Sequence, residues 1–214
     1  MTELVFDCVD AKPERYAAFP TLQFAIRIAE TTGARIHAIA LRCQVRIEPQ
    51  QRRYNEREAE RLLDLFGEMA RWGDTLKPMQ FANLSVMVPG FQGSTDLLLG
   101  VPCTYDFEVA AAKYFHSLED GEVPLLLLFS GTVFLKSRDG FMVEQIPWEK
   151  ECRFLMPVTV WRALMDLYFP NSAWIRIRRE TLDALQSFKS HRALPTWDDA
   201  FEALLKESRD ASPR

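Results

Sequence analysis

The stretch of sequence that decides the fold is IALRCQVRIE, residues 39–48. Apolar side chains occupy every second position of it: Ile39, Leu41, Cys43, Val45 and Ile47. A period of two predicts a β-strand that packs one face on a core and leaves the other to water or to a partner. Such strands are typical of antiparallel sheets, because parallel sheets are buried on both faces. The polar face carries Arg42, Gln44 and Arg46, which are either candidate partner-binding residues or simply solvated.

Other segments also have extended patterns. We expect strands at residues 3–9, 21–29, 79–91, 96–102, 123–129 and 141–146. Residues 105–118 are ambiguous. The alanines from Ala110 to Ala112 favour a helix, whereas apolar and polar residues alternate as far as Ala111, as in a strand. Because Glu119 to Glu122 is typical of a hairpin turn, we predict a long β-hairpin here and an antiparallel meander over residues 105–146.

Helices are expected in two parts of the chain. Asn55 and Glu58 have the spacing of a capping box, and an apolar stripe follows them at helical spacing as far as Met69 and Ala70. The C-terminal third predicts three more helices. The first opens at Pro157 and ends at Phe169-Pro170, the second carries Leu182, Leu185 and Phe188, and the third begins with Thr196 and Asp199.

These patterns together predict an α+β fold. We expect an antiparallel β-sheet, sandwich-like where it meets the N-terminal strands, with packed C-terminal helices. Residues 1–100 would hold the N-terminal strands and one amphipathic helix, and residues 101–207 the meander and the C-terminal helices. Residues 208–214 are expected to be a frayed tail, and the whole chain to form one compact unit.

The composition of the 214 residues argues against several classes of protein. Hydrophobic residues make up 48% and charged residues 26%, as in ordinary globular domains. The net charge of −4 argues against nucleic acid as the partner. No apolar run approaches the ~20 residues of a membrane-spanning helix, and the N-terminus lacks a signal-peptide pattern. We therefore expect a cytoplasmic protein without membrane insertion.

Catalytic and metal-binding motifs are not apparent in the sequence. The four cysteines form no C-x-x-C pair, the three histidines are scattered, and no phosphate-binding or dinucleotide-binding glycine motif occurs. We therefore expect no catalytic residues, no metal and no cofactor. The alternative is a small metal- or thiol-dependent enzyme, or a metal-delivery protein. It would use Cys103, which follows a proline at a strand end, with Tyr105 and Asp106, or His116.

Aromatic residues are dense between residues 148 and 174. Large rings provide apolar contact area at low cost in conformational entropy, so Trp148, Phe154 and Trp174 are further candidates for partner binding. Each ring also fits a core, and we expect Trp161 and Phe169 there because they lie on a helix stripe. Trp148 follows Pro147 at a strand end and is the ring we expect to be exposed.

The C-terminal half, about residues 104–190, resembles the SecB-type export chaperones. The resemblance rests on four features that occur in the family's order and at similar spacing: Pro157, Phe169-Pro170, the segment from Ile175 to Ile177, and Asp183-Ala184-Leu185. The chain lacks the family's aromatic residue after the helix-opening proline. This resemblance implies a meander followed by helices, and a homo-oligomer, but fold-level similarity does not transfer a function.

The whole chain is similar to a family of bacterial proteins encoded in some [NiFe]-hydrogenase gene clusters. The similarity rests on these stretches: Gln44 to Glu48, Val101 to Asp106, Gly121 to Pro124 with Leu128 to Gly131, and Ile146 to Trp148. The resemblance implies an accessory or maturation role and no known catalytic residues. The expected function is therefore non-catalytic protein binding by a chaperone or assembly factor, with a hydrogenase subunit or a maturation factor as the partner.

Overall fold

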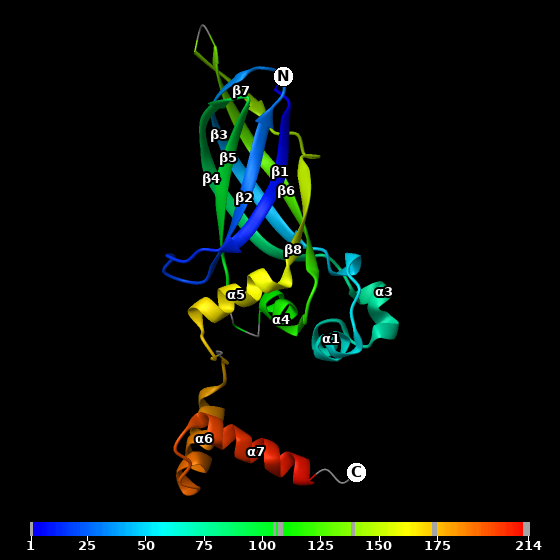
Figure 1. The fold of residues 1–214 in the computed structure, drawn as a ribbon, viewed down its shortest axis with the longest axis vertical. Helices are drawn as coiled ribbons and strands as arrows, with labels where there is room; N and C mark the ends of the chain where they lie inside the picture. Colours follow the sequence, from blue (N-terminus) through cyan, green and yellow to red (C-terminus); the bar gives the residue numbers. More distant parts are fainter. Residues whose placement is uncertain (1, 105, 107–108, 138–139, 173–174, 212–214) are drawn as a thin grey trace. The chain divides into compact units, whose positions relative to one another are not determined.

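The computed structural model in Figure 1 describes residues 2–104, 106, 109–137, 140–172 and 175–211. Its contacts divide the chain into two compact units, Met1–Trp174 and Ile175–Arg214. Strands from both sides of residue 100 share the larger sheet of the first unit. No helix in the described part of the chain is long and apolar enough to cross a lipid bilayer.

The first unit contains two antiparallel sheets, which confirms the α+β class. The three-stranded sheet has the order β1-β2-β5, with bounds Leu4–Pro13, Thr21–Glu30 and Ser94–Pro102. The five-stranded sheet has the order β4-β3-β6-β7, with β8 also paired to β6. The bounds of β3, β4, β6, β7 and β8 are Arg35–Ile47, Met79–Gln92, Glu122–Ser137, Gly140–Gln145 and Glu151–Pro157.

The core lies between the two sheets. In β3 the alternation works as the sequence predicts, because all five apolar positions from Ile39 to Ile47 are buried. Phe6 of β1 stacks on Phe129 of β6 with 4.2 Å between ring centroids, and Phe24 of β2 meets Phe154 of β8 edge-on at 6.2 Å. Aromatic contacts of this kind between the two sheets show that their inner faces share one hydrophobic core.

The segment after β3 forms several short helices instead of the long helix expected over residues 55–70. A 3₁₀ turn spans Pro49–Gln51, and the capping box of Asn55 and Glu58 opens α1, Glu56–Arg61, as predicted. Then follow α2, Leu63–Phe66, a 3₁₀ turn at Met69–Arg71, and α3, Trp72–Thr75. Gly67 ends α2 with a φ of +70°, which turns the chain and leaves Met69 exposed. The predicted apolar stripe therefore stops at Phe66.

The β-hairpin expected over residues 105–129 is wrong, because residues 110–117 form a helix. This is α4, Ala110–Ser117. Ala111, Tyr114, Phe115 and Leu118 are all buried at helical spacing, whereas the alternation favouring a strand reaches only Ala111. Residues 119–121 therefore connect a helix to β6 rather than two strands. The next hairpin, β6–β7, forms as the predicted meander requires, and residues 138 and 139 between its strands lie outside the described residues.

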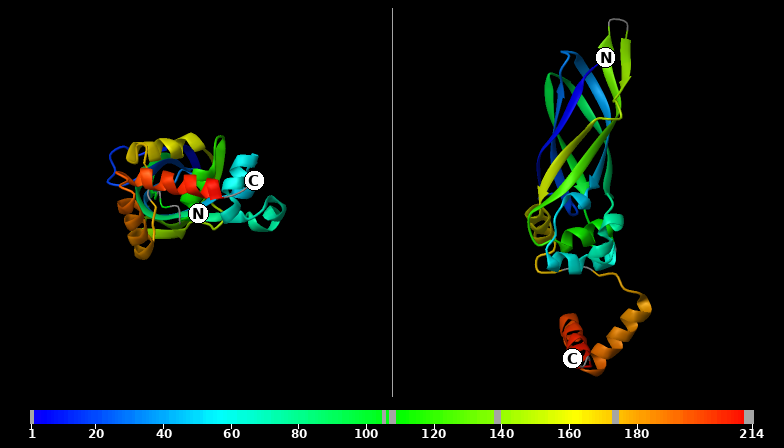
Figure 2. Two further views of the ribbon diagram at one scale, coloured as in Figure 1. Left: turned by 90° about the horizontal axis from the view of Figure 1, so that it is seen from below. Right: turned by 90° about the vertical axis from the view of Figure 1, so that its right-hand side faces the viewer.

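Helix α5, Val158–Tyr168, follows β8 directly, with Pro157 at its N-cap. Trp161 is buried on its inner face, as predicted, and so is Leu164, whereas Leu167 is exposed. Figures 1 and 2 show α4, α5 and the α1–α3 segment together at one end of the two sheets, with the β6–β7 hairpin at the opposite end. Among the described residues of the first unit, no helix covers the outer face of the five-stranded sheet between these two ends.

The second unit contains two helices, α6, Arg179–His191, and α7, Trp197–Ala211. Thr196 and Asp199 form the expected reciprocal cap at the start of α7, with the Thr196 backbone amide 3.0 Å from an Asp199 carboxylate oxygen. Helix α7 continues to Ala211 and so includes much of the segment predicted to be frayed.

Candidate functional site

The outer face of the five-stranded sheet carries the polar side of β3. Arg42 lies opposite Ser85 of β4 and Ser130 of β6, and Gln44 lies opposite Asn83 and Leu128. Residues directly opposite in an antiparallel pair point to the same face of the sheet. The register therefore places these side chains in two adjacent rows on one surface.

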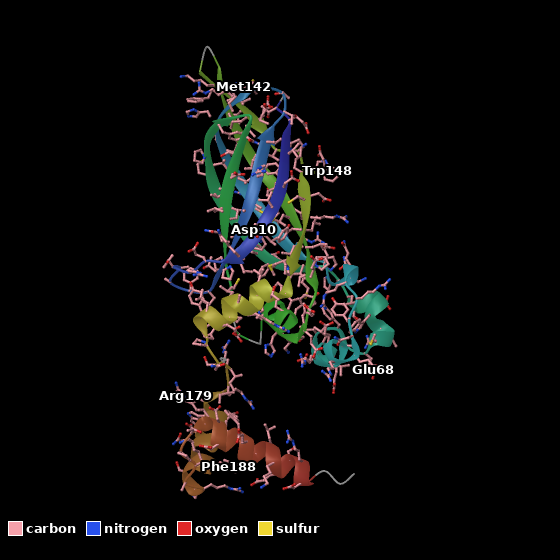
Figure 3. All side chains as sticks on the ribbon, in the orientation of Figure 1. Asp10, Glu68, Met142, Trp148, Arg179 and Phe188 are labelled. Atoms are coloured by element: carbon pink, nitrogen blue, oxygen red, sulfur yellow. The ribbon has the colours of Figure 1, made fainter. Side chains whose placement is uncertain are left out.

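A hollow of about 510 Å³ lies on this outer face. Arg42, Gln44, Leu128, Ser130 and Trp148 are among its lining residues, which come from β3, β4, β6 and the loop before β8. Trp148 is 89% exposed, in agreement with its predicted position at a strand end, and Figure 3 labels it beside β8. A tryptophan this exposed leaves a large apolar area in water and stabilises the isolated chain very little.

The polar groups of the hollow differ in how far they are already paired. The Gln44 side-chain amide donates to the Gln80 side-chain carbonyl at 3.4 Å, and Arg46, one row away, lies 3.4 Å from the Glu48 carboxylate. Arg42 is exposed and makes no ion pair with any residue that the structure describes. Its guanidinium is therefore available to a carboxylate from outside the chain.

Apolar side chains continue the surface on both sides of the hollow. Met87 of β4 lies in the row next to Arg42, and Val143 of β7 lies opposite Phe134 one row further on. Both Met87 and Val143 are exposed, as is Leu155 of β8. A surface with exposed apolar groups around Arg42 and Trp148 has the composition of a protein–protein contact site.

The structure brings together three of the six residues predicted for partner binding: Arg42, Gln44 and Trp148. Arg46 lies next to them. Phe154 points inward, where it packs against the core and Phe24. Trp174 lies outside the described residues. Sequence reasoning missed Leu128, because the uninterrupted apolar run 123–129 hides which of its residues face outward.

Cys103, the centre of the alternative site, is a partly buried thiol. Its Sγ donates to the Val101 carbonyl at 3.3 Å, and burial raises its pKa to about 12. A thiol with so high a pKa is protonated near neutral pH and is a poor nucleophile or metal ligand. Tyr105 lies outside the described residues.

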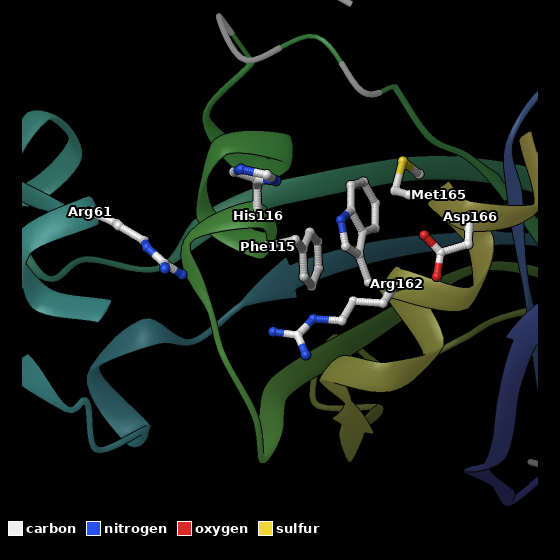
Figure 4. Close-up of a pocket in the computed structure, with 7 residues that line it drawn as sticks. Arg61, Phe115, His116, Arg162, Met165 and Asp166 are labelled. Carbon is white, nitrogen blue, oxygen red and sulfur yellow. The ribbon is translucent and has the colours of Figure 1, made fainter. Parts of the chain in front are cut away.

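His116 lines a different hollow, of about 430 Å³, to which Cys103 does not contribute. Figure 4 shows His116 on α4, with Arg61 extending into the hollow from α1, and Arg162 and Asp166 on α5. Burial lowers the pKa of His116, and the positive charges of Arg61 and Arg162 lower it further. In the described part of the chain, no three His, Cys, Asp or Glu side chains are grouped to hold a metal ion.

The remaining cysteines are closer together than their spacing in the sequence indicates. Burial, followed by the neighbouring Cys152 thiol, raises the pKa of Cys8 and of Cys43 to about 12. Burial raises the pKa of Cys152 to about 11. These thiols come from β1, β3 and β8, and Cys43 and Cys152 are among the buried core residues. Their environment is that of small apolar residues in a core.

Fold and surface together define an α+β protein with two antiparallel sheets and a hollow on the outer face of the larger one. The chain belongs to DUF6084, a family of unknown function, whose model matches residues 1–213. No curated protein matches the chain.

Among solved structures, the chain is similar to beta-glucosidase 3B from Thermotoga neapolitana in complex with α-D-glucose. The identity is 16% over 72% of this chain and 17% of that chain, with a TM-score of 0.27. It is also similar to a beta-glucosidase from Kluyveromyces marxianus, at 14% identity over 72% of this chain and 15% of that chain, with a TM-score of 0.25. The chain thus spans less than a fifth of the length of either enzyme.

Proposed function

We propose that this protein is a non-catalytic accessory factor that binds another protein through the outer face of its five-stranded sheet. The observation that carries the proposal is the convergence of Arg42, Gln44 and Trp148 on one hollow. Arg42 and Gln44 are neighbours on β3, whereas Trp148 lies more than a hundred residues further along the chain. The pairing of β3 with β6, and the backbone hydrogen bonds of residues 146 and 150 to β6, bring the three together. Tryptophan and arginine are the residue types that contribute most to binding energy in protein interfaces.

The surface combines two kinds of contact. A partner side chain that covers the Trp148 ring removes apolar area from water, and a partner carboxylate beside Arg42 forms a charge-assisted hydrogen bond. The exposed Met87 and Val143 extend the apolar contact. A face that was only solvated would need neither the exposed indole nor these apolar neighbours.

The partner we propose is a [NiFe]-hydrogenase subunit or one of its maturation factors, with the protein acting as a chaperone or assembly factor. Support comes from the stretches similar to proteins encoded beside hydrogenases, one of which, Gln44 to Glu48, supplies Gln44 of the hollow. We propose the cytoplasm as the compartment. The four cysteines are free, as is usual for proteins in a reducing environment.

The alternative, a thiol- or metal-dependent enzyme, gains no support from the surroundings of Cys103 and His116. The Cys103 thiol has a raised pKa, and the two residues do not line a common hollow. We therefore propose protein binding alone as the function.

The test is a binding experiment in two stages. The tagged chain is first purified from its native host under hydrogenase-expressing conditions, and the co-purifying proteins are identified by mass spectrometry. A purified hydrogenase subunit or maturation factor is then titrated against the wild-type chain and against Trp148→Ala. We expect the variant to bind about tenfold more weakly or worse, as for an interface hot spot.

The matched control is Tyr16→Ala. Tyr16 is an exposed aromatic residue in the loop between β1 and β2, away from the sheet face, and its removal should leave the affinity unchanged. If no hydrogenase subunit or maturation factor is enriched, the proposed partner is wrong. If Trp148→Ala and Tyr16→Ala bind equally well, the proposed surface is wrong.

A further inference from the structure

The second unit exposes an apolar surface formed by its two helices. Leu182 of α6 and Trp197 and Leu205 of α7 are exposed to 42%, 38% and 58%. The half-buried apolar residues between them are Leu185, Phe188, Phe201 and Leu204. On α7 the apolar positions recur at intervals of three and four residues, so they form one stripe along the helix. Figure 3 labels Phe188 on the α6 part of this surface.

Contact between α6 and α7 leaves this stripe largely uncovered. Helix α6 has no buried residue, and in residues 175–210 of the described chain only Ala200 is buried. The helices have 13 and 15 residues, a length at which isolated helices are marginal in water and depend on packing of an apolar face. Since two helices that bury one alanine form no adequate core, the apolar stripe needs a further surface against it.

The charges of the unit indicate what that surface is. Residues 175–192 carry five Arg and Lys against two Asp and Glu, a net charge of +3. Helix α7 carries five Asp and Glu against two Arg and Lys, a net charge of −3. Arg192 and Glu207 already pair the two helices within one chain. A two-fold axis that places α6 of one copy against α7 of another repeats this complementarity and encloses the apolar stripes.

We propose that two copies of this chain associate through the apolar faces of their α6 and α7 helices, so that the four helices enclose one core. Each copy contributes the same surface, so that Leu182, Trp197 and Leu205 of both copies form the centre of the contact. Residues 192–196 join α6 to α7, and Figures 1 and 2 show the two helices crossing steeply rather than lying side by side along their lengths. The inference is independent of the proposed sheet-face partner, because it uses the other unit of the chain.

The test is sedimentation-equilibrium ultracentrifugation of the full chain over a range of concentrations. We expect a monomer–dimer equilibrium in the wild type. Leu205→Glu and Leu182→Glu should each raise the dissociation constant about tenfold or more, because they place an uncompensated carboxylate in the apolar contact. Leu98→Glu is the control: Leu98 is an exposed leucine of β5, with 55% exposure, and this variant should dimerise like the wild type.

A charge exchange tests the pairing of α6 with α7. Arg179→Glu on α6 and Glu202→Lys on α7 should each weaken self-association, whereas a mixture of the two variants should form a heterodimer more readily than either variant alone. Circular dichroism of each variant checks that its helices remain folded. The proposal is overturned if the wild type stays monomeric or if Leu98→Glu dissociates the dimer as Leu205→Glu does. It is also overturned if Leu205→Glu and Leu182→Glu both dimerise normally.

Discussion

The guanidinium of Arg52 lies 2.8 Å from the carboxylate of Glu58, and both side chains are almost fully buried. Burial on its own raises the pKa of Glu58. The hydrogen bonds from Arg52 and from the backbone amides of Glu119 and Asn55 outweigh it and hold the pKa below the usual value. Arg52 also donates to the Glu122 carbonyl at 3.1 Å. The ion pair therefore joins α1 to the start of β6.

Replacing Glu58 should destabilise the fold substantially. Glu58→Gln leaves Arg52 buried without its counter-ion, which costs about 3 kcal/mol in the free energy of unfolding at pH 7. Urea denaturation measures this loss. Glu60→Gln is the matched control, because Glu60 lies exposed on the same helix and its replacement should change the free energy by less than about 0.5 kcal/mol.

The same pair predicts a pH dependence. The folded-state pKa of Glu58 is depressed, so its contribution to stability is fully present above the unfolded pKa of about 4.3 and is lost as the pH falls through the folded pKa. The difference in stability between the wild type and Glu58→Gln should therefore shrink as the pH is lowered below about 4.3. A difference that stays constant over this range would show that the carboxylate charge contributes nothing.

Phe129 should be among the residues that contribute most to stability. Its ring stacks on Phe6 across the two sheets and is buried. Phe129→Ala removes that contact and leaves a cavity, at a cost of about 4 kcal/mol. Phe141→Ala, in the exposed strand β7, should change the free energy of unfolding by less than about 0.5 kcal/mol. Equal effects of the two substitutions would contradict the proposed position of the core.

Gly131 allows β3 and β6 to approach each other. It has a φ of +139°, and a Cβ atom added there would lie 2.1 Å from the Ala40 carbonyl oxygen. Gly131→Ala should therefore cost well over the ~1 kcal/mol of a typical substitution. Gly100→Ala in β5 meets its nearest atom, Thr21 Cγ2, at 3.4 Å and should be tolerated. Thermal unfolding measures both variants. A lower midpoint for Gly131→Ala alone would support the close approach of β3 and β6, whereas an equal loss in both variants would show a general intolerance of alanine in these strands.

The sequence predicts this fold unevenly, for physical reasons that differ from segment to segment. Alternation in β3 is predictive because only one face of that strand is buried. Residues 105–118 mislead because a short alternation overlaps the helical spacing of Ala111, Tyr114 and Phe115. The exposure of Trp148 follows from its neighbour Pro147, but its approach to Arg42 does not. That approach depends on long-range strand register, which no local pattern encodes.

The four cysteines should be unreactive in the folded protein. Burial raises the pKa of Cys103 to about 12 and that of Cys152 to about 11, so almost no thiolate is present at pH 8. A colorimetric disulfide reagent should therefore react slowly with the native chain and rapidly with all four thiols after denaturation. If one thiol reacts rapidly in the native state and Cys103→Ser abolishes that reaction, the result would support the thiol-dependent enzyme instead.

Among the tryptophans that the structure describes in the first unit, Trp148 should be the most accessible to solvent, since Trp72 and Trp161 are buried. An exposed indole emits at longer wavelength and is quenched by iodide. Trp148→Phe should therefore shift the emission to shorter wavelength and reduce the quenched fraction, with the free energy of unfolding changed by less than about 0.5 kcal/mol. Trp161→Phe is the control, because removing a buried ring should leave iodide quenching intact and lower the stability.

If the purified partner binds this surface, its addition to the wild type should reproduce the loss of quenching that Trp148→Phe causes. Undiminished quenching in the complex would show that the partner leaves Trp148 in water, and would place its binding site elsewhere on the chain.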